Sequence, residues 1–110
     1  MSYFNTAAQS AEVSFFNSSD DFQRLLAVTE TLGLDPSDPP TCVIRNVVVR
    51  GLRFNVLDWN SPTADPAASP IFLVHGGAVS AHTWDLVAMQ LARKFRVITP
   101  DIRGHGDSEW

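Results

Sequence analysis

Lysine is almost absent from this sequence, in which Lys94 is the only one. The 110 residues carry 8 basic and 12 acidic side chains, which gives a formal net charge of −4 at pH 7. Recognition of nucleic acid or of an acidic lipid surface depends on clustered basic side chains, and the sequence contains no such cluster. We therefore expect neither a nucleic acid nor a membrane as a partner.

Cysteine is nearly absent as well, because Cys42 is the only one. One cysteine excludes an internal disulfide framework and a cysteine-rich metal site, and its apolar neighbours predict a small, inert core residue. His75, His82 and His105 lack the spacing of a zinc-binding helix, and the glycine-rich dinucleotide and triphosphate motifs are missing. No run approaches the roughly 18 apolar residues of a membrane span, and residues 1–19 lack a signal-peptide pattern. These absences predict a cytoplasmic protein without a metal or cofactor.

Residues 1–41 are predicted to form an N-terminal leader, a short amphipathic helix and a proline-rich linker. The first 18 residues are mixed in character and are expected to be loosely ordered. From Ser19, a suitable N-cap, apolar side chains recur at helical spacing, and Gly33 suits the position just past the helix. The segment 35–40 holds three prolines and marks the linker into the main domain, 42–110.

Two runs after the linker, 42–49 and 52–59, have the composition of β-strands. The first is rich in β-branched residues, and the second alternates apolar with polar ones. The Arg50-Gly51 step supplies a turn, so the two runs predict an antiparallel hairpin. Residues 60–70 contain three prolines and should form a surface loop.

A strand, a helix and a second strand are predicted to follow. Residues 71–74 are a continuous apolar run, which is typical of a strand buried on both faces of a parallel sheet. Residues 81–95 have helical spacing, and their apolar side chains Trp84, Val87 and Leu91 are expected in the core. With the strand at 96–100, this is a βαβ unit with a right-handed crossover, and the fold class is α/β. Ligands are then expected beyond the carboxyl ends of the parallel strands.

Both motifs that could carry chemistry fall at those carboxyl ends. His75-Gly76-Gly77 follows the first strand of the unit, and the run Asp-Ile-Arg-Gly-His-Gly-Asp-Ser at 101–108 follows the second. We expect Gly76 and Gly77 to turn the chain with positive φ and to present N–H groups that no Cβ obstructs. N–H groups of this kind can stabilise the oxyanion of a tetrahedral acyl intermediate, where the loss of one donor costs roughly 10²–10³-fold in rate.

The two motifs, in this order and context, resemble the start of the α/β-hydrolase family over residues 42–110. In that family a His-Gly loop follows one strand, and an Asp-x-Arg-Gly-His-Gly-x-Ser loop follows the next. The resemblance implies that this chain is the N-terminal part of such a domain and that Gly77 provides a backbone donor of the oxyanion hole. The other matching positions are expected to shape the pocket: His75, Gly76, Ala78, Asp101, Arg103, Gly104, His105, Gly106 and Ser108.

The histidines and charged residues near these loops are expected to have structural roles. The family's catalytic histidine lies near the C-terminus of its domain, so His75 and His105 are predicted to be hydrogen-bonding residues. Asp101 and Arg103 are expected to brace their loop, with direct substrate contact as the alternative. His82, near the start of a helix, is expected to be solvated.

A nucleophile is the component that the motifs do not supply. The family places it in a G-x-S-x-G elbow after an apolar strand. Residues 106–110 imitate this motif, but Trp110 replaces the final glycine and no apolar strand comes before it. Ser108 is therefore predicted to be a helix cap. We expect a fragment that ends before the nucleophile, acid and catalytic histidine, and that is inactive by itself.

Three functions stay open for the whole protein. The favoured one is a cofactor-free serine hydrolase that acts on a small ester or acyl substrate. Epoxide hydrolases and dehalogenases of this fold use an aspartate nucleophile, and usually carry other residues where this chain has Gly77 and Ala78. A receptor or binding protein that keeps the fold without the catalytic residues is the third. The family's sheet order also leaves strand 71–74 with an unpaired apolar edge, which predicts that the isolated chain self-associates.

Overall fold

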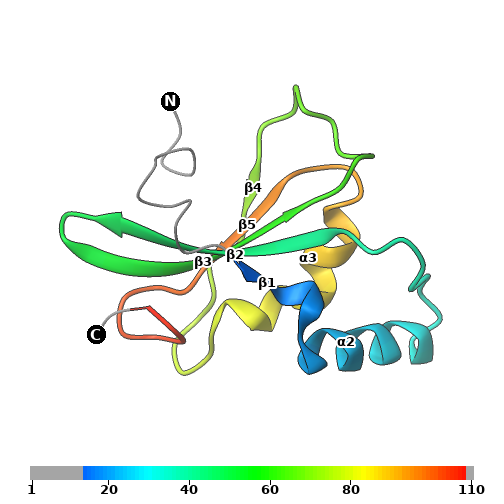
Figure 1. Ribbon diagram of the computed structural model, residues 1–110, viewed down its shortest axis with the longest axis horizontal. Helices are drawn as coiled ribbons and strands as arrows, with labels where there is room; N and C mark the ends of the chain where they lie inside the picture. The colour runs from blue at the N-terminus through cyan, green and yellow to red at the C-terminus, as the bar shows by residue number, and fades with distance from the viewer. Residues whose placement is uncertain (1–13, 109–110) are drawn as a thin grey trace.

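The computed structural model describes residues 14–108 (Figure 1). Most of the segment predicted to be a loosely ordered leader, 1–13, lies outside the described residues. The rest of it differs from the prediction, because Ser14–Phe15 form a short strand, β1, and Phe16–Ser18 form a 3₁₀ turn. Phe16 is only 4% exposed and packs edge-on against the rings of Phe22 and Trp59. Burial of a large aromatic side chain contributes favourable free energy, and this contribution keeps the segment around Phe16 ordered against the sheet.

Within residues 14–108, five strands make one mixed sheet. Its members are β1, β2 (Thr41–Val49), β3 (Leu52–Asn60), β4 (Ile71–Phe72) and β5 (Val97–Pro100), in the order β1-β2-β3-β5-β4. The pairs β1–β2, β2–β3 and β3–β5 are antiparallel, whereas β4 and β5 are parallel. The α/β class is confirmed, and so are the hairpin and the strand, helix, strand unit.

The turn of the hairpin has the backbone that its sequence predicts. Arg50 has a φ of 52° and Gly51 a φ of 78°. Two consecutive positive φ angles in a two-residue loop match the right-handed twist of the flanking strands. The nine paired positions of β2 and β3 therefore follow without a register break.

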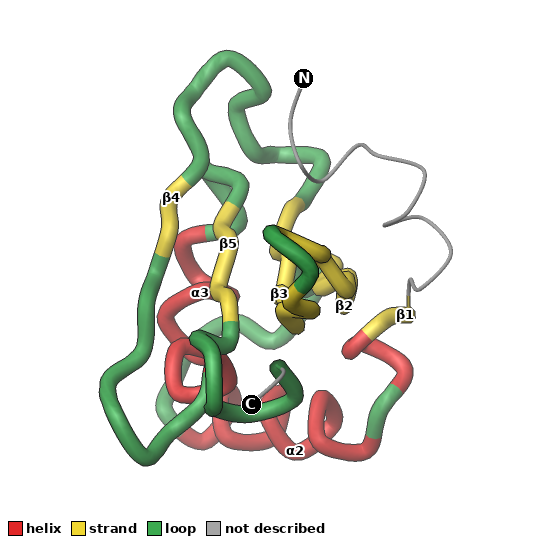
Figure 2. The backbone as a smooth tube through the Cα atoms, turned by 90° about the vertical axis from the view of Figure 1, so that its left-hand side faces the viewer, coloured by secondary structure: helices red, strands yellow, loops and turns green. Residues whose placement is uncertain are grey.

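In the described part of the chain, one face of the sheet is covered by two helices, α2 (Asp20–Thr31) and α3 (Asp85–Leu91) (Figure 2). Side chains alternate along a strand, so neighbouring residues serve different faces. Leu57 and Val97 pack with the helices, whereas Val56 and Ile98 form a smaller apolar cluster with Val47 on the other face. The larger cluster contains Phe16, Phe22, Cys42, Leu57, Trp59, Ala81, Ala88, Met89, Ala92 and Val97.

The ends of α2 agree with the sequence pattern. The Ser19 hydroxyl accepts a hydrogen bond of 3.1 Å from the N–H of Phe22, and Gly33 has a φ of 78° just after the helix. The linker that follows is held by Arg93, whose guanidinium donates to backbone oxygens at three of its residues. Because Phe22 shares a core with Trp59, α2 packs on the sheet, and the division into 1–41 and 42–110 stays a prediction.

Strand β4 differs from its prediction. The sequence suggested burial on both faces over 71–74, but the paired strand is shorter, and Phe72 and Val74 are 56% and 57% exposed. The physical reason is its position: β4 is the edge strand, with β5 as its one neighbour among the described strands. Ile71 and Leu73 point to the core that α3 helps to form, and the alternate side chains reach solvent.

The predicted helix 81–95 is also interrupted. Ala81–Trp84 form a 3₁₀ turn, α3 covers seven residues, and turns complete the segment. A 3₁₀ turn has three residues per turn, so it shifts the buried face relative to one continuous α-helix. Val87 is 46% exposed as a result, so its predicted place in the core is wrong. Ala88, Met89 and Ala92 are the fully buried positions, Leu91 packs against the same core as predicted, and Trp84 is partly buried. No helix among residues 14–108 is long and apolar enough to cross a bilayer.

Candidate functional site

Two loops leave the sheet at the same end. Residues 75–80 follow β4 and residues 101–108 follow β5, and the two strands are parallel, so their carboxyl ends coincide (Figure 2). This is the end of an open α/β sheet at which ligands bind. The two sequence motifs are thereby brought together.

His75 connects the first loop to the second. Its ring is buried, with the residue 4% exposed. The Nε2 atom accepts a hydrogen bond of 3.0 Å from the N–H of Ile102, and Nδ1 lies 2.7 Å from the carbonyl oxygen of Gly76. These partners assign the neutral tautomer with its proton on Nδ1. Both nitrogens are occupied, which fits a hydrogen-bonding role better than proton transfer to a substrate.

Asp101 is the centre of the second loop, and its residue is 1% exposed. One carboxylate oxygen accepts a hydrogen bond of 2.6 Å from the N–H of Ala81. The other accepts bonds of 3.0 Å each from the Asn55 side-chain amide and the N–H of Asp107. The donors come from β3, from the 3₁₀ turn and from the loop itself. Asp101 therefore holds three segments together, as expected of a bracing residue.

Ser108 is buried beneath the same loop and is 3% exposed. Its hydroxyl donates to the Asp101 carbonyl oxygen at 2.6 Å and accepts from the N–H of Asn55 at 2.8 Å. A hydroxyl with both functions engaged and no access to solvent is poorly placed to attack a substrate. The predicted helix cap would act on residues 109–110 and beyond, which lie outside the described residues.

The glycine loop differs from its prediction in one respect. Positive φ was expected at Gly76 and Gly77, but the residue with positive φ is Ala78, at 62°. The chain reverses one residue later than the glycine pair suggested. A Cβ on Gly76 or Gly77 would meet no atom of the described residues within 4 Å. Neither N–H group donates a hydrogen bond among residues 14–108, and both residues are exposed.

The remaining positions of the second motif, 103–106, belong to the 101–108 loop and are less buried than Asp101 and Ser108. Gly104 and Gly106 have φ of 79° and 52°, so glycine suits both positions. His105 directs Nδ1 to the Arg103 carbonyl oxygen at 3.1 Å, and its ring lies 5.2 Å from that of His75. Arg103 is exposed, and its guanidinium forms no ion pair or hydrogen bond with other described residues. The prediction that Arg103 braces its loop therefore finds no support in its contacts with the described residues.

His82 is more engaged than a solvated residue would be. Its Nδ1 lies 2.8 Å from a carboxylate oxygen of Asp85, and its ring centroid is 4.7 Å from that of Phe16. The hydrogen bond to Asp85 raises the pKa of His82, while burial raises the pKa of Asp85. The side chain of His82 is still 40% exposed.

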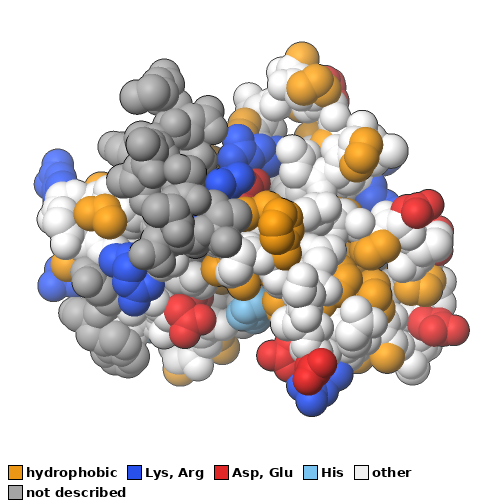
Figure 3. Space-filling view, viewed as in Figure 1, with side chains coloured by type: hydrophobic (Ala, Val, Ile, Leu, Met, Phe, Trp, Pro, Cys, Tyr) orange, Lys and Arg blue, Asp and Glu red, His pale blue; other side chains and the backbone are white. Residues whose placement is uncertain are grey.

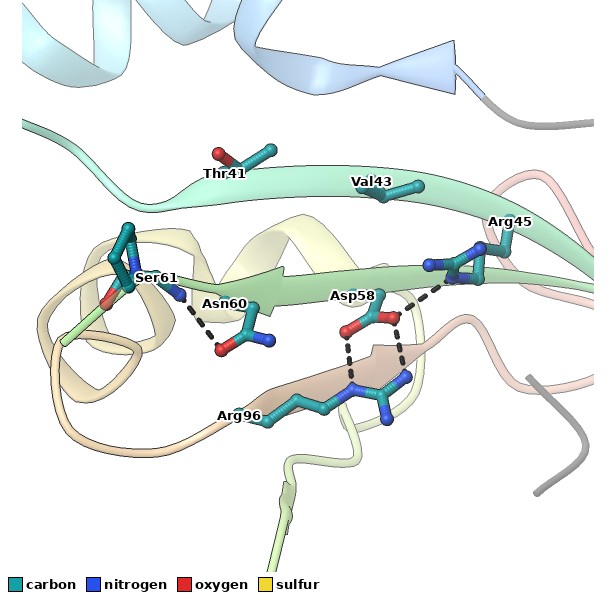
Figure 4. Close-up of a pocket in the computed structure, with 8 residues that line it drawn as sticks. Thr41, Val43, Arg45, Asp58, Asn60, Ser61 and Arg96 are labelled. Carbon is teal, nitrogen blue, oxygen red and sulfur yellow. Dashed lines mark hydrogen bonds and ion pairs between the residues drawn. The ribbon is translucent and has the colours of Figure 1, made fainter. Parts of the chain in front are cut away.

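Sequence reasoning missed a polar cluster at the opposite end of β5 (Figure 4). Asp58, 4% exposed, accepts two hydrogen bonds from Arg96, at 2.9 and 2.7 Å, and one from Arg45 at 3.0 Å. The Asp58 carboxylate raises the pKa of Arg96. A groove of about 550 Å³ beside them is lined also by Thr41, Val43, Asn60, Ser61 and Pro62. Arg96 precedes β5 and Asp101 follows it, so this groove is separate from the two loops.

Two partners in the loop site were missed as well, Asn55 and Ala81. Asn55 occupies a polar position of an alternating strand, which usually faces solvent, yet it is 4% exposed. Ala81 contributes only its backbone N–H, which no side-chain pattern reveals. The alternating pattern of β3 therefore gave no signal that could have found either residue.

Other features of the surface and core bear on partners and cofactors. Within the described part of the chain, no three His, Cys, Asp or Glu side chains gather as a metal site requires.

Cys42 is fully buried, and burial raises the pKa of its thiol well above the ordinary value. Figure 3 shows Lys and Arg side chains at separate places on one face, several of them beside acidic ones. The expected absence of metal, cofactor and polyanion binding stays a prediction.

Comparison with known proteins shows which family and which relatives this chain is similar to. A family model described as alpha/beta hydrolase fold matches residues 69–109, which include both loops. The chain is 51% identical over 43 residues to a probable protein phosphatase methylesterase 1 of Caenorhabditis elegans, over 36% of this chain and 12% of that protein. It is 50% identical over 40 residues to a soluble epoxide hydrolase of Corynebacterium sp. (strain C12), over 36% of this chain and 14% of that protein.

A solved structure supports the same fold. The crystal structure of Cfl2 from Burkholderia cenocepacia matches with a TM-score of 0.52 and 28% sequence identity, over 62% of this chain and 22% of that one. The chain thus spans between 12% and 22% of the length of these three proteins. The relatives named as hydrolases include a methylesterase and an epoxide hydrolase.

Proposed function

Because the chain belongs to the α/β-hydrolase fold family, we propose that its 75–80 loop supplies the oxyanion hole of a hydrolase. The observation that carries the proposal is the state of the loop backbone. Gly76 and Gly77 are exposed residues, and their N–H groups donate no hydrogen bond among residues 14–108. They also follow a parallel strand at its carboxyl end, where a substrate would lie.

We propose that the whole protein hydrolyses an ester or acyl bond of a small molecule with a serine nucleophile. The serine oxygen would attack the carbonyl carbon, and the carbonyl oxygen would take the negative charge, which the N–H of Gly77 would stabilise. The alcohol then leaves, and water releases the acid from the acyl-enzyme. Gly77 and Ala78 place no polar side chain in the loop, which favours backbone stabilisation, and the methylesterase relative has matching chemistry.

Ser108 is not the nucleophile in this proposal. Its burial and its two short hydrogen bonds support that assignment. We therefore propose that residues 1–110 alone have no esterase activity. Turnover of a chromogenic short-chain ester by this chain, if abolished by Ser108→Ala, would overturn the assignment.

Removal of the proposed donor tests the function directly. In the whole protein, Gly77→Pro removes the N–H, and kcat for the ester should fall by about 10²–10³-fold. Gly77→Ala is the matched control, because it retains the N–H and its Cβ meets no described atom within 4 Å. Equal losses in the two variants would count against an oxyanion role for this N–H.

A second candidate is a hydrolase with an aspartate nucleophile, which the match to an epoxide hydrolase favours. One labelling experiment separates the two. A single turnover in H₂¹⁸O places ¹⁸O in the enzyme when a carboxylate forms the covalent ester. A fluorophosphonate instead labels an activated serine.

The exposed edge of the sheet has a consequence for the isolated chain. Phe72 and Val74 are more than half exposed on β4, which has no partner on its outer side among the described strands. We propose that residues 1–110 self-associate through this edge. Sedimentation should show oligomers that Phe72→Lys with Val74→Lys reduces. A monomeric, cooperatively melting wild-type chain would contradict the proposal.

A further inference from the structure

We propose that Asp101 is a positioning residue for the oxyanion loop, because its carboxylate fixes the point at which that loop enters the 3₁₀ turn at Ala81. The catalytic consequence rests on the proposed function. The hydrogen bonds themselves do not depend on it, so the two can fail separately.

The loop between His75 and Ala81 has two anchors. At its start, the His75 ring accepts a hydrogen bond from the N–H of Ile102. At its end, the N–H of Ala81 donates to the Asp101 carboxylate at 2.6 Å. Between them, no backbone N–H of residues 76–79 donates a hydrogen bond within the described part of the chain. The direction of the Gly77 N–H therefore depends on these two anchors, both on residues 101–102.

A carboxylate is the group that this position requires. Its partners are three N–H donors, those of Ala81, Asn55 and Asp107, and none of them is charged. An ionised carboxylate offers about four acceptor positions and no donor. An asparagine of the same shape has one acceptor oxygen and an NH₂ group, so at least one backbone N–H would face another N–H. The Ala81 and Asp107 bonds cannot both survive that exchange.

Gly106 makes room for this arrangement. A Cβ at this position would collide with the Asp101 carboxylate, and the φ of Gly106 is positive. The second loop therefore closes over Asp101 only because residue 106 has no side chain. Gly106→Ala should displace the carboxylate while leaving its chemistry intact, which gives an independent way to disturb the same anchor.

Direct participation of Asp101 in catalysis does not fit its surroundings. The residue is 1% exposed, and both carboxylate oxygens already accept hydrogen bonds from the protein. No substrate atom can reach it without displacing Ala81 or Asp107. It acts on the reaction through the loop that it holds.

The test compares Asp101→Asn with Asp107→Asn in the whole protein. Both changes remove one carboxylate from the same loop, but the Asp107 side chain forms no hydrogen bond with other described residues. We expect Asp101→Asn to lower kcat about tenfold or more, a fraction of the loss from removing a donor outright, with KM within about twofold. Hydrogen–deuterium exchange of the Ala81 amide, which is buried and donates to Asp101, should become about tenfold faster or more as this anchor opens. Asp107→Asn should change neither quantity.

A further variant separates positioning from stability. Asn55→Ala removes the one donor that belongs to the sheet, so it should lower stability yet leave kcat within about twofold and exchange of the Ala81 amide unchanged. A purely structural role predicts instead that kcat follows stability in all variants, and that result would overturn the proposal. If Asp101→Asn does not fold, Gly106→Ala serves as the test of the positioning role. The same loss in kcat and the same faster exchange of the Ala81 amide are then expected.

The outcomes also separate the proposal from the proposed function. A wild-type protein without esterase activity refutes the function, and the exchange measurement still decides whether Asp101 anchors the loop. Unchanged exchange of the Ala81 amide in both Asp101→Asn and Gly106→Ala refutes the positioning role, whatever the activity.

Discussion

Two buried carboxylates flank β5, and their surroundings differ. Asp58 lies on β3, opposite Ile98 of β5, and is neutralised by the guanidinium groups of Arg45 and Arg96. Asp101, just after the end of β5, is held by three uncharged N–H donors. The arginine side chains are 23% and 30% exposed and can return to water, whereas the donors around Asp101 include main-chain groups fixed in place. The arginines around Asp58 compensate its negative charge, whereas the hydrogen bonds around Asp101 fix the shape of two loops.

The difference between the two carboxylates predicts that substitution of Asp101 causes the largest loss of stability. Asp101→Ala leaves the N–H of Ala81 and the amide of Asn55 without an acceptor in the interior. Each unsatisfied buried donor costs about 1–3 kcal/mol, so the free energy of unfolding should fall by about 2–6 kcal/mol. Urea denaturation of the whole protein measures this loss. A loss below about 1 kcal/mol would mean that the loop relaxes around the missing carboxylate.

A smaller loss is expected at the other carboxylate. Asp58→Ala frees two arginines that already reach solvent, so the free energy of unfolding should fall by only about 1–2 kcal/mol. The same denaturation experiment gives the difference between the two variants. An equal or larger loss at Asp58 would show that charge compensation matters more than the loop hydrogen bonds.

Backbone strain at the loop end gives a change of opposite sign. Ala78 has a φ of 62°, a conformation that costs a residue with a Cβ about 1–2 kcal/mol. Ala78→Gly should raise the free energy of unfolding by about 0.5–1 kcal/mol, since the greater freedom of unfolded glycine offsets part of the gain. Gly51→Ala, at a φ of 78° in the hairpin turn, is the reciprocal control and should be destabilising. Destabilisation by Ala78→Gly would indicate that the loop needs the Ala78 methyl group.

The smallest effect concerns a third carboxylate, Asp85, which has a histidine partner. The Asp85 hydrogen bond raises the pKa of His82 in the folded state, so the pair stabilises the fold fully below the unfolded pKa of about 6.5. This contribution is lost as the pH rises through the raised folded value. The side chain is 40% exposed, so the change between pH 6 and 8 should stay below about 1 kcal/mol. His82→Gln should flatten this part of the stability profile, and an unchanged slope would assign it to other groups.

Local patterns predicted the regular elements and the two loops. Alternation, turn residues and capping residues are short-range signals, and they located the hairpin, α2 and the strands on either side of α3. Long-range partners gave no such signal. Asn55 looked like an outward polar residue because nothing within β3 indicates Asp101, 46 positions away. Phe16 was missed for the same reason, since its place in the core depends on Trp59.

Backbone detail was predicted least well. The glycines of the first loop marked a turn, but the positive φ falls on Ala78, because glycine permits that conformation without requiring it. The extent of burial on β4 depended on its neighbours in the sheet, which a continuous apolar run does not reveal. The sequence therefore indicated which residues form the two loops, whereas their backbone angles and buried partners came from the structure, and the chemistry of the site stays a prediction.

The packing of Phe16 and Phe22 on Trp59 also has a spectroscopic consequence. Trp59 is fully buried, with ring centroids 6.0 and 6.5 Å from the two phenylalanines. Its indole is shielded from water partly by residues that precede the linker. The fluorescence of Trp59 therefore reports whether the N-terminal helix is docked, and a red shift in its emission would mark the moment when that helix leaves the sheet.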